Sequence, residues 1–325
     1  MHSETTVGDL SEKQILARIA ERTGSADQAL VGPGDDAAVL RVSGSLVATT
    51  DTLIEGPDFR SEWSDGYSLG WKSAAVNLSD VAAMGARPTA LLVALAMPNA
   101  TPIAYVERIA DGLREACEQL APGCAVVGGD LTQSDVLTVA VTALGDMGGR
   151  APVLRSGARP GDTVALAGDM GVAARGLEIL FDRFDGSAPD LSLLDDAERY
   201  AVERQLRPLP PVALGLAAAD AGAHAMMDVS DGLALDATRL ADASGVTLDL
   251  DSSLLGPDPR RALGGGEDHA LLAVFAGDVP DGFRAIGRVL ERAGDALLVD
   301  GAPFAGRAGW DPYRDWTGSS GSAGQ

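Results

Sequence analysis

Residues 72–88 have the sequence KSAAVNLSDVAAMGARP, and the apolar run TALLVALAMP follows directly at residues 89–98. The apolar residues of the first stretch recur at helical spacing, which predicts a helix over about residues 67–84. Gly85 is suited to end this helix in the left-handed conformation. The second stretch predicts a buried strand at Leu91–Ala96. A helix followed at once by a buried strand is typical of an α/β protein.

The same alternation extends in both directions along the chain. Upstream, Ser11-x-x-Gln14 matches a capping box that would begin a helix, and strands are expected near residues 37–42 and 45–50. Downstream, Thr101 is expected to cap a helix that ends near Leu120. Further strands are expected at 126–127 and 136–144, joined through the loop GGDLTQSD, and at 163–167, 246–250 and 270–275, together with a short strand that ends at Asp228. Further helices are expected after residue 171 as far as Leu180, directly after Pro211, and at 233–244.

The length of 325 residues predicts two domains, because a domain takes roughly 150 residues. The stretch Gly145–Asp162 is rich in turn residues and is the expected boundary. We therefore predict a two-domain α/β (α+β) fold. Its parts would be an N-terminal domain at 1–148, a C-terminal α/β domain at 149–316 and a disordered tail at 317–325.

The charge balance restricts the possible partners. Twenty-five basic and 47 acidic residues give a net charge of −22 on a chain that is 46% hydrophobic. Such a field repels nucleic acid and anionic membranes, so neither is an expected partner. No apolar run approaches the roughly 20 residues of a membrane span. A cytoplasmic location is therefore expected.

Several common catalytic machineries have no support in the sequence. Cys117 and Cys124 are too few for a disulfide framework, and three scattered histidines do not form a zinc motif. Neither lysine belongs to a Walker loop, and no nucleophile elbow occurs, so no protein nucleophile is expected. Gly32-Pro-Gly-Asp-Asp-Ala37 matches a dinucleotide fingerprint only weakly, because a strand rather than a helix is expected after it.

Aspartates are the informative residues of this chain. Several directly follow short apolar runs, as though placed at strand ends, and most have glycine, serine or threonine neighbours. Clustered carboxylates repel each other unless cations hold them, and oxygen donors without histidine or thiolate suit Mg²⁺ with a phosphorylated ligand. The aspartates in question are Asp36, Asp51, Asp80, Asp130, Asp228 and Asp231.

The motifs together resemble one family. GPGDDAAVL, TTDTLIEG, KSAAVNLSDVAAMGARP, VVGGDLT, LRSGARPGD, MMDVSDGL and GGGEDHAL occur in the order expected of thiamine-monophosphate kinases, from about Gly32 to Trp310. The wider superfamily includes aminoimidazole-ribonucleotide synthetase, selenophosphate synthetase and a hydrogenase maturation dehydratase. All are ATP-using enzymes with two α/β domains.

The resemblance implies a homodimer in which two N-terminal sheets form a shared barrel. It also implies Mg²⁺-dependent transfer of the γ-phosphoryl group of ATP directly to thiamine monophosphate, giving thiamine diphosphate and ADP. Residues matching positions that hold several Mg²⁺ ions are Asp36, Thr49, Thr50, Asp51, Asp80, Asp130, Asp228 and Asp231. Residues matching ATP positions are Gly129, Asp130, Arg155 and Ser230, and those near thiamine monophosphate are Asp58, Glu267 and Trp310.

Two positions depart from the family pattern. Asp58 lies in GPDF where the family usually carries histidine, which puts that substrate contact in question, and GGEDH replaces the commoner GGEDY. Two alternatives therefore stay open. One is a sister synthetase, although no cysteine precedes Cys117 as selenophosphate synthetase would require. The other is a non-catalytic protein that binds Mg²⁺ or nucleotide.

Overall fold

The computed structural model describes residues 5–34, 36–306 and 308–310, so the expected tail at 317–325 lies outside the described residues. The chain folds into two compact units. The first comprises Met1–Val81, Arg87–Gly149 and Gly186–Pro189, and the second comprises Ala82–Ala86, Arg150–Asp185 and Asp190–Gln325. Among the described residues, no helix is both long and apolar enough to cross a membrane.

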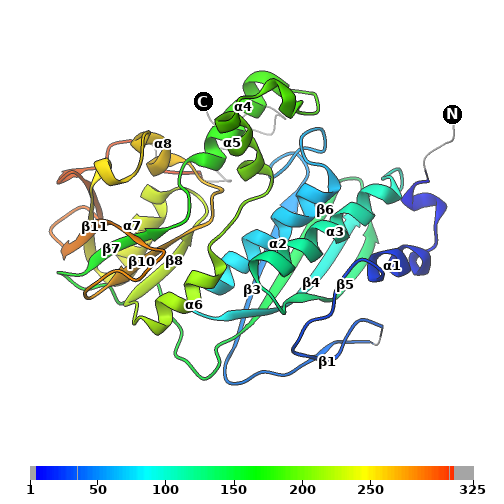
Figure 1. Cartoon of the computed structure of the whole chain (residues 1–325), viewed down its shortest axis with the longest axis horizontal. Helices are drawn as coiled ribbons and strands as arrows, with labels where there is room; N and C mark the ends of the chain where they lie inside the picture. The colour runs from blue at the N-terminus through cyan, green and yellow to red at the C-terminus, as the bar shows by residue number, and fades with distance from the viewer. Residues whose placement is uncertain (1–4, 35, 307, 311–325) are drawn as a thin grey trace. The chain divides into compact units, whose positions relative to one another are not determined.

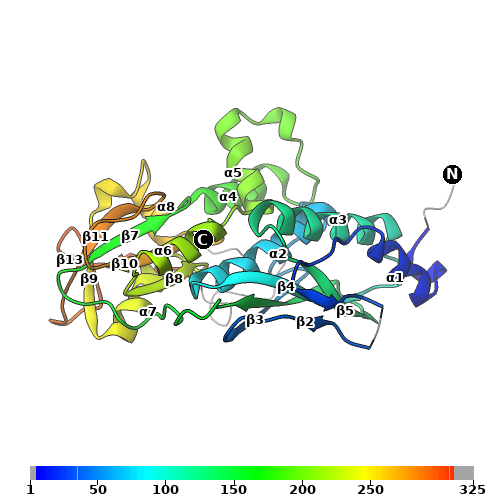
Figure 2. The same cartoon turned by 60° about the horizontal axis from the view of Figure 1, so that its bottom comes forward.

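A four-stranded sheet with the order β3-β6-β4-β5 is the centre of the first unit. Strand β6 pairs antiparallel with both β3 and β4, whereas β4 and β5 run parallel. A parallel pair needs a crossover connection, which helix α3 provides. Figure 2 shows α2 and α3 on one face of this sheet. The bounds are β3 Leu46–Ile54, α2 Gly66–Ala83, β4 Arg87–Met97, α3 Ile103–Leu120, β5 Ala125–Gln133 and β6 Thr138–Asp146.

The two faces of this sheet differ in exposure. Because side chains alternate along a strand, Leu91 and Val141 are buried under the helices while Leu92 is 37% exposed on the other face. We call this second face the open face. It includes Ala48, Thr50, Thr52, Ile54, Leu92, Ala94 and Asp130, all of which are exposed. The strand expected at Leu91–Ala96 is therefore buried on one face only.

The N-terminal segment packs at the border of this unit. Helix α1, Glu12–Ala20, begins with the capping box predicted for Ser11 and Gln14, and both hydrogen bonds of the box are present. Strands β1 (Ala29–Val31) and β2 (Val39–Leu40) form a small hairpin. Alanine and leucine side chains of this hairpin pack on Ala90 and Val127 and so cover one end of the open face.

The second unit is built on a seven-stranded sheet with both faces covered (Figure 1). Leu240 of α7 packs with Leu272 on one face, and Ala218 of α6 packs with Leu271 on the other. Strand β10 is buried along its whole length, as a central strand with two covered faces must be. The sheet order is β13-β12-β9-β11-β7-β10-β8. Its elements are β7 Thr163–Ala167, α4 Val172–Phe184, α5 Asp196–Leu206, α6 Val212–Asp220, β8 Ala225–Val229, α7 Leu233–Ser244, β9 Val246–Leu250, α8 Pro259–Gly264, β10 Ala270–Phe275, β11 Arg284–Glu291, β12 Leu297–Val299 and β13 Ala302–Pro303.

Two local expectations were wrong. The segment GGDLTQSD is not a loop, because β5 continues through both glycines to Gln133. A Cβ atom on Gly129 would collide with the backbone carbonyl of Val93, so this glycine permits close approach of two strands rather than a turn. Thr101 does not cap α3. The N-cap is Pro102, which makes no side-chain capping bond.

Candidate active site

The first group of predicted residues lies where β3 faces α2. Thr49 and Asp51 alternate with Thr50, so both point toward the helix-covered face. The Oγ1 atom of Thr49 donates a hydrogen bond of 2.8 Å to Oδ2 of Asp80 on α2. The backbone N–H of Asp51 donates to Oδ1 of Asn77, one helical turn before Asp80, at 3.1 Å. The fold therefore joins Thr49, Asp51 and Asp80 into one oxygen-rich group.

Thr50 and Asp130 belong to the opposite side of the sheet. Residue pairing places Thr52, Ala140, Ala94 and Asp130 in one row across the four strands, two residues along from Thr50. Paired residues share a face, so the side chains of Thr50 and Asp130 start from the open face. The structure thus divides the predicted N-terminal metal set between two faces of the sheet.

Two further predicted residues lie in exposed loops of the first unit. Asp36 precedes β2. Asp58 follows β3, and its Oδ2 accepts a 2.8 Å hydrogen bond from the backbone N–H of Ile54. The N–H of Asp58 in turn donates to the Ile54 carbonyl at 3.1 Å. Asp58 therefore closes the turn at the end of β3, a task that histidine at this position would not perform in the same way.

Three loops of the second unit bring four of the other predicted residues together. The N–H of Glu267 donates to the carbonyl of Ser230 at 2.8 Å, and the N–H of Trp310 donates to the carbonyl of Asp231 at 2.9 Å. Residues far apart in sequence are therefore fixed side by side through their backbones. The C-terminal loop group, as we call it, comprises Ser230, Asp231, Glu267 and Trp310.

Ionic contacts surround the aspartates of this unit. Arg239 bridges Oδ2 of Asp231 at 2.6 Å and Oδ1 of Asp236 at 2.7 Å. Burial, reinforced by the charge of Asp231, raises the pKa of Asp236 to about 6. Buried Asp228, on β8, lies 3.4 Å from Nδ1 of His269. A ligand that binds Asp231 would therefore share it with Arg239.

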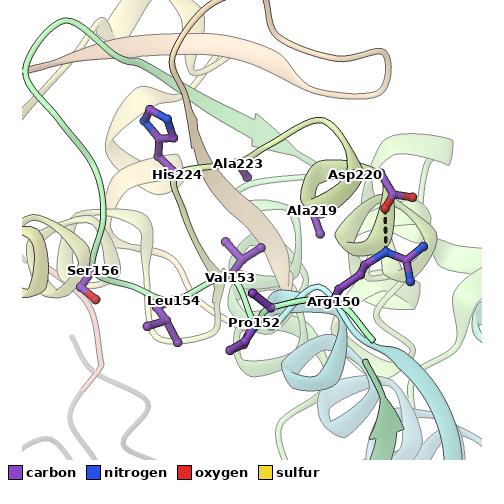
Figure 3. A pocket seen from close by; sticks show the side chains of 10 residues that line it. Arg150, Pro152, Val153, Leu154, Ser156, Ala219, Asp220, Ala223 and His224 are labelled. Atoms are coloured by element: carbon purple, nitrogen blue, oxygen red, sulfur yellow. Dashed lines mark hydrogen bonds and ion pairs between the residues drawn. The ribbon is translucent and has the colours of Figure 1, made fainter. Parts of the chain in front are cut away.

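Arg155 and a nearby pocket lie in the segment that begins the second unit. The side chain of Arg155 is exposed, while its carbonyl accepts a 3.0 Å bond from Oγ of Ser244. A cavity of about 520 Å³ lies beside this segment and is lined by its neighbours Leu154 and Ser156 but not by Arg155. Figure 3 shows an ion pair between Arg150 and Asp220, of 2.7 Å, at one side of the cavity. The largest polar groups that line it are thus already paired, and it contains none of the predicted residues.

The donor set fits Mg²⁺ that is shared with phosphate groups. Within the described ranges, no three His, Cys, Asp or Glu side chains come close enough to hold a metal ion by themselves. Mg²⁺ typically uses one or two carboxylates and completes its shell with water and phosphate oxygens. The pair Thr49–Asp80 with Asp51 offers hard oxygen donors of this kind, and so does the pair Asp228 and Asp231.

Sequence reasoning missed several residues that shape these groups. Asn77 supports Asp51, Arg239 pairs with Asp231, and Asp268 binds a helix terminus as described below. Asn77 lies inside the motif KSAAVNLSDVAAMGARP and Asp268 inside GGGEDHAL, so the predicted site residues next to them could have pointed to both. Arg239 lies within α7, eight residues after Asp231, and no spacing rule links the two. The expected placement of aspartates at strand ends holds for Asp228 but not for Asp51 and Asp130, which lie within strands.

Comparison with known proteins identifies the family. The model described as AIR synthase related protein, N-terminal domain, matches residues 34–147, and its C-terminal counterpart matches 159–297. The thiamine-monophosphate kinase of Mycobacterium tuberculosis (strain ATCC 25618 / H37Rv) is 41% identical, over 95% of this chain and 93% of that protein.

Solved structures give the same result. The crystal structure of thiamine-monophosphate kinase from Stenotrophomonas maltophilia K279a has a TM-score of 0.74 at 36% identity, covering 94% of this chain and 100% of that one. A structure described as AaThiL complexed with AMPPCP and TMP has a TM-score of 0.73 at 30% identity, covering 95% and 99%. The arrangement of two AIR synthase related domains, with relatives of this identity along nearly the whole chain, places the protein in the thiamine-monophosphate kinase family.

Proposed function

We propose that this chain transfers the γ-phosphoryl group of ATP to thiamine monophosphate, giving thiamine diphosphate and ADP. The observation that carries the proposal is the likeness to a solved relative that holds AMPPCP and TMP, which extends over 95% of this chain. The gathering of Ser230, Asp231, Glu267 and Trp310 adds support from this structure, since these residues match ATP, metal and substrate positions.

The residues suit direct transfer between phosphate groups. The acceptor is a phosphate monoester, which is already an oxyanion near neutral pH and needs no general base. The two cysteines are buried and free, so they do not serve as nucleophiles. What remains for the protein is to align the acceptor phosphate with the triphosphate of ATP and to offset the repulsion between their negative charges, as in phosphoryl transfer generally. No phosphorylated enzyme is expected.

Several Mg²⁺ ions would be held, some by Asp36, Thr49, Thr50, Asp51, Asp80 and Asp130 in the first unit and others by Asp228 and Asp231 in the second. When bound, they would offset the negative charge of the phosphate oxygens. Gly129, Asp130, Arg155 and Ser230 would contact ATP. The exposed guanidinium of Arg155 suits a phosphate because of its planar pair of donors.

Thiamine monophosphate would lie near Asp58, Glu267 and Trp310. An indole ring and a carboxylate suit the cationic thiazolium, since the ring face attracts cations and the carboxylate carries the opposite charge. Asp58 would add a second carboxylate in place of the usual histidine.

The open face supports a homodimer. Its strands β3 and β5 are the two edges of a four-stranded sheet, and two such sheets joined edge to edge would make an eight-stranded barrel. Exposed apolar side chains, including Ile54 (40%) and Leu92 (37%), would fill the interior of that barrel. Two N-terminal sheets would thereby cover the apolar side chains of each other's open faces.

Ligand-dependent melting tests the binding part of this proposal. We expect Mg²⁺ with a non-hydrolysable ATP analogue to raise the melting temperature, and thiamine monophosphate to raise it further, because ligands that bind the folded state stabilise it. Thiamine without a phosphate is the control and should have a smaller effect. A nucleotide response with no response to thiamine monophosphate would favour a non-catalytic nucleotide-binding protein.

A further inference from the structure

Asp268, directly after Glu267, is bound to the start of helix α4. Its Oδ2 accepts a 2.6 Å hydrogen bond from the N–H of Gly171, and its Oδ1 accepts a 2.7 Å bond from the N–H of Ala173. The first N–H groups of a helix have no partner within the helix, so a carboxylate is well suited to this place. Asp268 is only 6% exposed and thus takes this terminus out of reach of solvent.

The backbone around Asp268 is held in an uncommon conformation. Glu267 and His269 have φ angles of 74° and 53°, in the left-handed region that non-glycine residues rarely adopt. A non-glycine backbone in this region is strained and persists only where the surroundings hold it. Here the N–H of Glu267 donates a hydrogen bond to the carbonyl of Ser230, and the carboxylate of Asp268 accepts hydrogen bonds from the start of α4. The strained Glu267 is therefore fixed on both sides.

Close packing leaves this loop little freedom to shift as a body. A Cβ atom on Gly266 would collide with the carbonyl oxygen of Ser230 and lie 3.0 Å from the carbonyl carbon of Asp231. The loop thus lies directly against the Ser230–Asp231 loop, while Asp268 ties it to the segment before α4. That segment is itself held by α5, since the hydroxyl of Tyr200 donates to Asp169 at 2.6 Å.

We propose that Asp268 is a positioning residue for substrate binding: its contact with α4 holds Glu267 in the left-handed conformation in which the Glu267 side chain meets thiamine monophosphate. This inference deepens the proposed function and rests on it for the identity of the substrate. Asp268 itself does not touch the substrate. Its carboxylate is occupied by two backbone N–H groups, so its effect on binding passes through Glu267.

The matched control is Asp146, at the end of β6. It is also a buried carboxylate, 5% exposed, and it also accepts two backbone hydrogen bonds, from Ser43 and Gly148 at 2.8 Å each. It belongs to the first unit and to none of the predicted site groups. Asp268→Asn and Asp146→Asn each place an amide N–H₂ against one backbone donor. The melting temperature of each variant is measured beside its kinetics, so that a kinetic difference between two folded variants reports position rather than folding.

Steady-state kinetics give the first readout. We expect Asp268→Asn to raise KM for thiamine monophosphate at least about tenfold with a smaller change in KM for ATP, because small misplacements of a binding group are costly. Asp146→Asn should leave both KM values within about twofold. In a Glu267→Gln background, Asp268→Asn should add little, since two residues that act as a unit are not additive. Equal KM effects in the two Asn variants, or full additivity with Glu267→Gln, would overturn the proposal.

Hydrogen exchange gives a readout that needs no turnover. Asp268→Asn should speed exchange in peptides covering both 168–175 and 264–270, because the contact joins these two segments. Asp146→Asn should change neither. Unchanged exchange at 264–270 in Asp268→Asn would show that Glu267 is held without Asp268 and would overturn the inference. If Asp268→Asn speeds exchange as expected but the wild-type protein has no kinase activity on thiamine monophosphate, the proposed substrate is contradicted while the positioning of Glu267 stands.

Discussion

Among single residues, the fold brings some of the predicted oxygen ligands together and separates others. Thr49 and Asp80 are hydrogen-bonded, whereas Asp130 begins on the other face of the sheet. The sequence motifs identified all three residues but could not show this division. It depends on the register of four strands, which no single motif encodes.

Asp130 should be needed for turnover and dispensable for folding. Its side chain is exposed and makes no hydrogen bond or ion pair with the described part of the chain, so Asp130→Asn should leave the melting temperature nearly unchanged. Loss of a ligand to metal and ATP should lower kcat on the order of a hundredfold or more. Calorimetry together with initial rates checks both statements. Normal activity in this variant would remove Asp130 from the site.

Asp58 tests the departure from the family pattern. Asp58→His should keep or lower KM for thiamine monophosphate if the position contacts the substrate, although it removes the carboxylate that closes the turn to Ile54. Asp58→Asn is the control, because its amide oxygen can still accept that bond; it lacks the negative charge and should raise KM if the position contacts the substrate. If KM were unchanged in both variants, the position would be peripheral to the substrate.

At the scale of elements, periodicity and capping rules predicted most helices and central strands. The capping box at Ser11 and the bounds of α7, β9 and β10 are confirmed. Strand β5 was predicted too short, because glycines that allow close strand approach look like turn residues in a sequence. Helix α5 has a strongly polar sequence, DAERYAVERQL, and gave no clear apolar stripe.

The two glycines of β5 should respond differently to substitution. Gly129→Ala places a Cβ against the Val93 carbonyl, whereas the Cβ of Gly128→Ala would meet the flexible end of Leu92 at 3.2 Å. Overpacking against backbone should cost about 1–3 kcal/mol of unfolding free energy in Gly129→Ala and clearly less in Gly128→Ala. Urea unfolding of the two variants measures the difference. Equal losses would contradict the close approach of β4 and β5.

The loop that contains Asp268 should give stability a pH dependence. Burial raises the pKa of Asp268 to about 6, against two opposing backbone hydrogen bonds. The folded state therefore keeps the proton at pH values where the unfolded chain has released it. The resulting stabilisation is complete below about pH 4 and disappears as pH rises through about 6. The free energy of unfolding should therefore fall between about pH 4 and pH 6. Asp268→Asn should make this fall smaller, because asparagine does not titrate. An unchanged slope in urea unfolding would show that Asp268 does not titrate in this range.

For the whole molecule, the proposed homodimer places a second copy of the chain against the open face of the first unit. Leu92→Asp would place a carboxylate inside the proposed barrel and should convert a dimer into monomers in sedimentation velocity experiments. Leu193→Asp is the control, because Leu193 is 62% exposed in the second unit. A wild-type monomer, or a Leu92→Asp dimer of unchanged affinity, would contradict the shared barrel.

The proposed transfer of a phosphoryl group from ATP to thiamine monophosphate can be followed directly. The most direct measurement incubates the purified protein with Mg²⁺, γ-labelled ATP and thiamine monophosphate, and follows the label. We expect label in thiamine diphosphate, none on the protein, and no labelled product when thiamine replaces its monophosphate. Intact ATP, or label released only as inorganic phosphate, would contradict the proposed transfer.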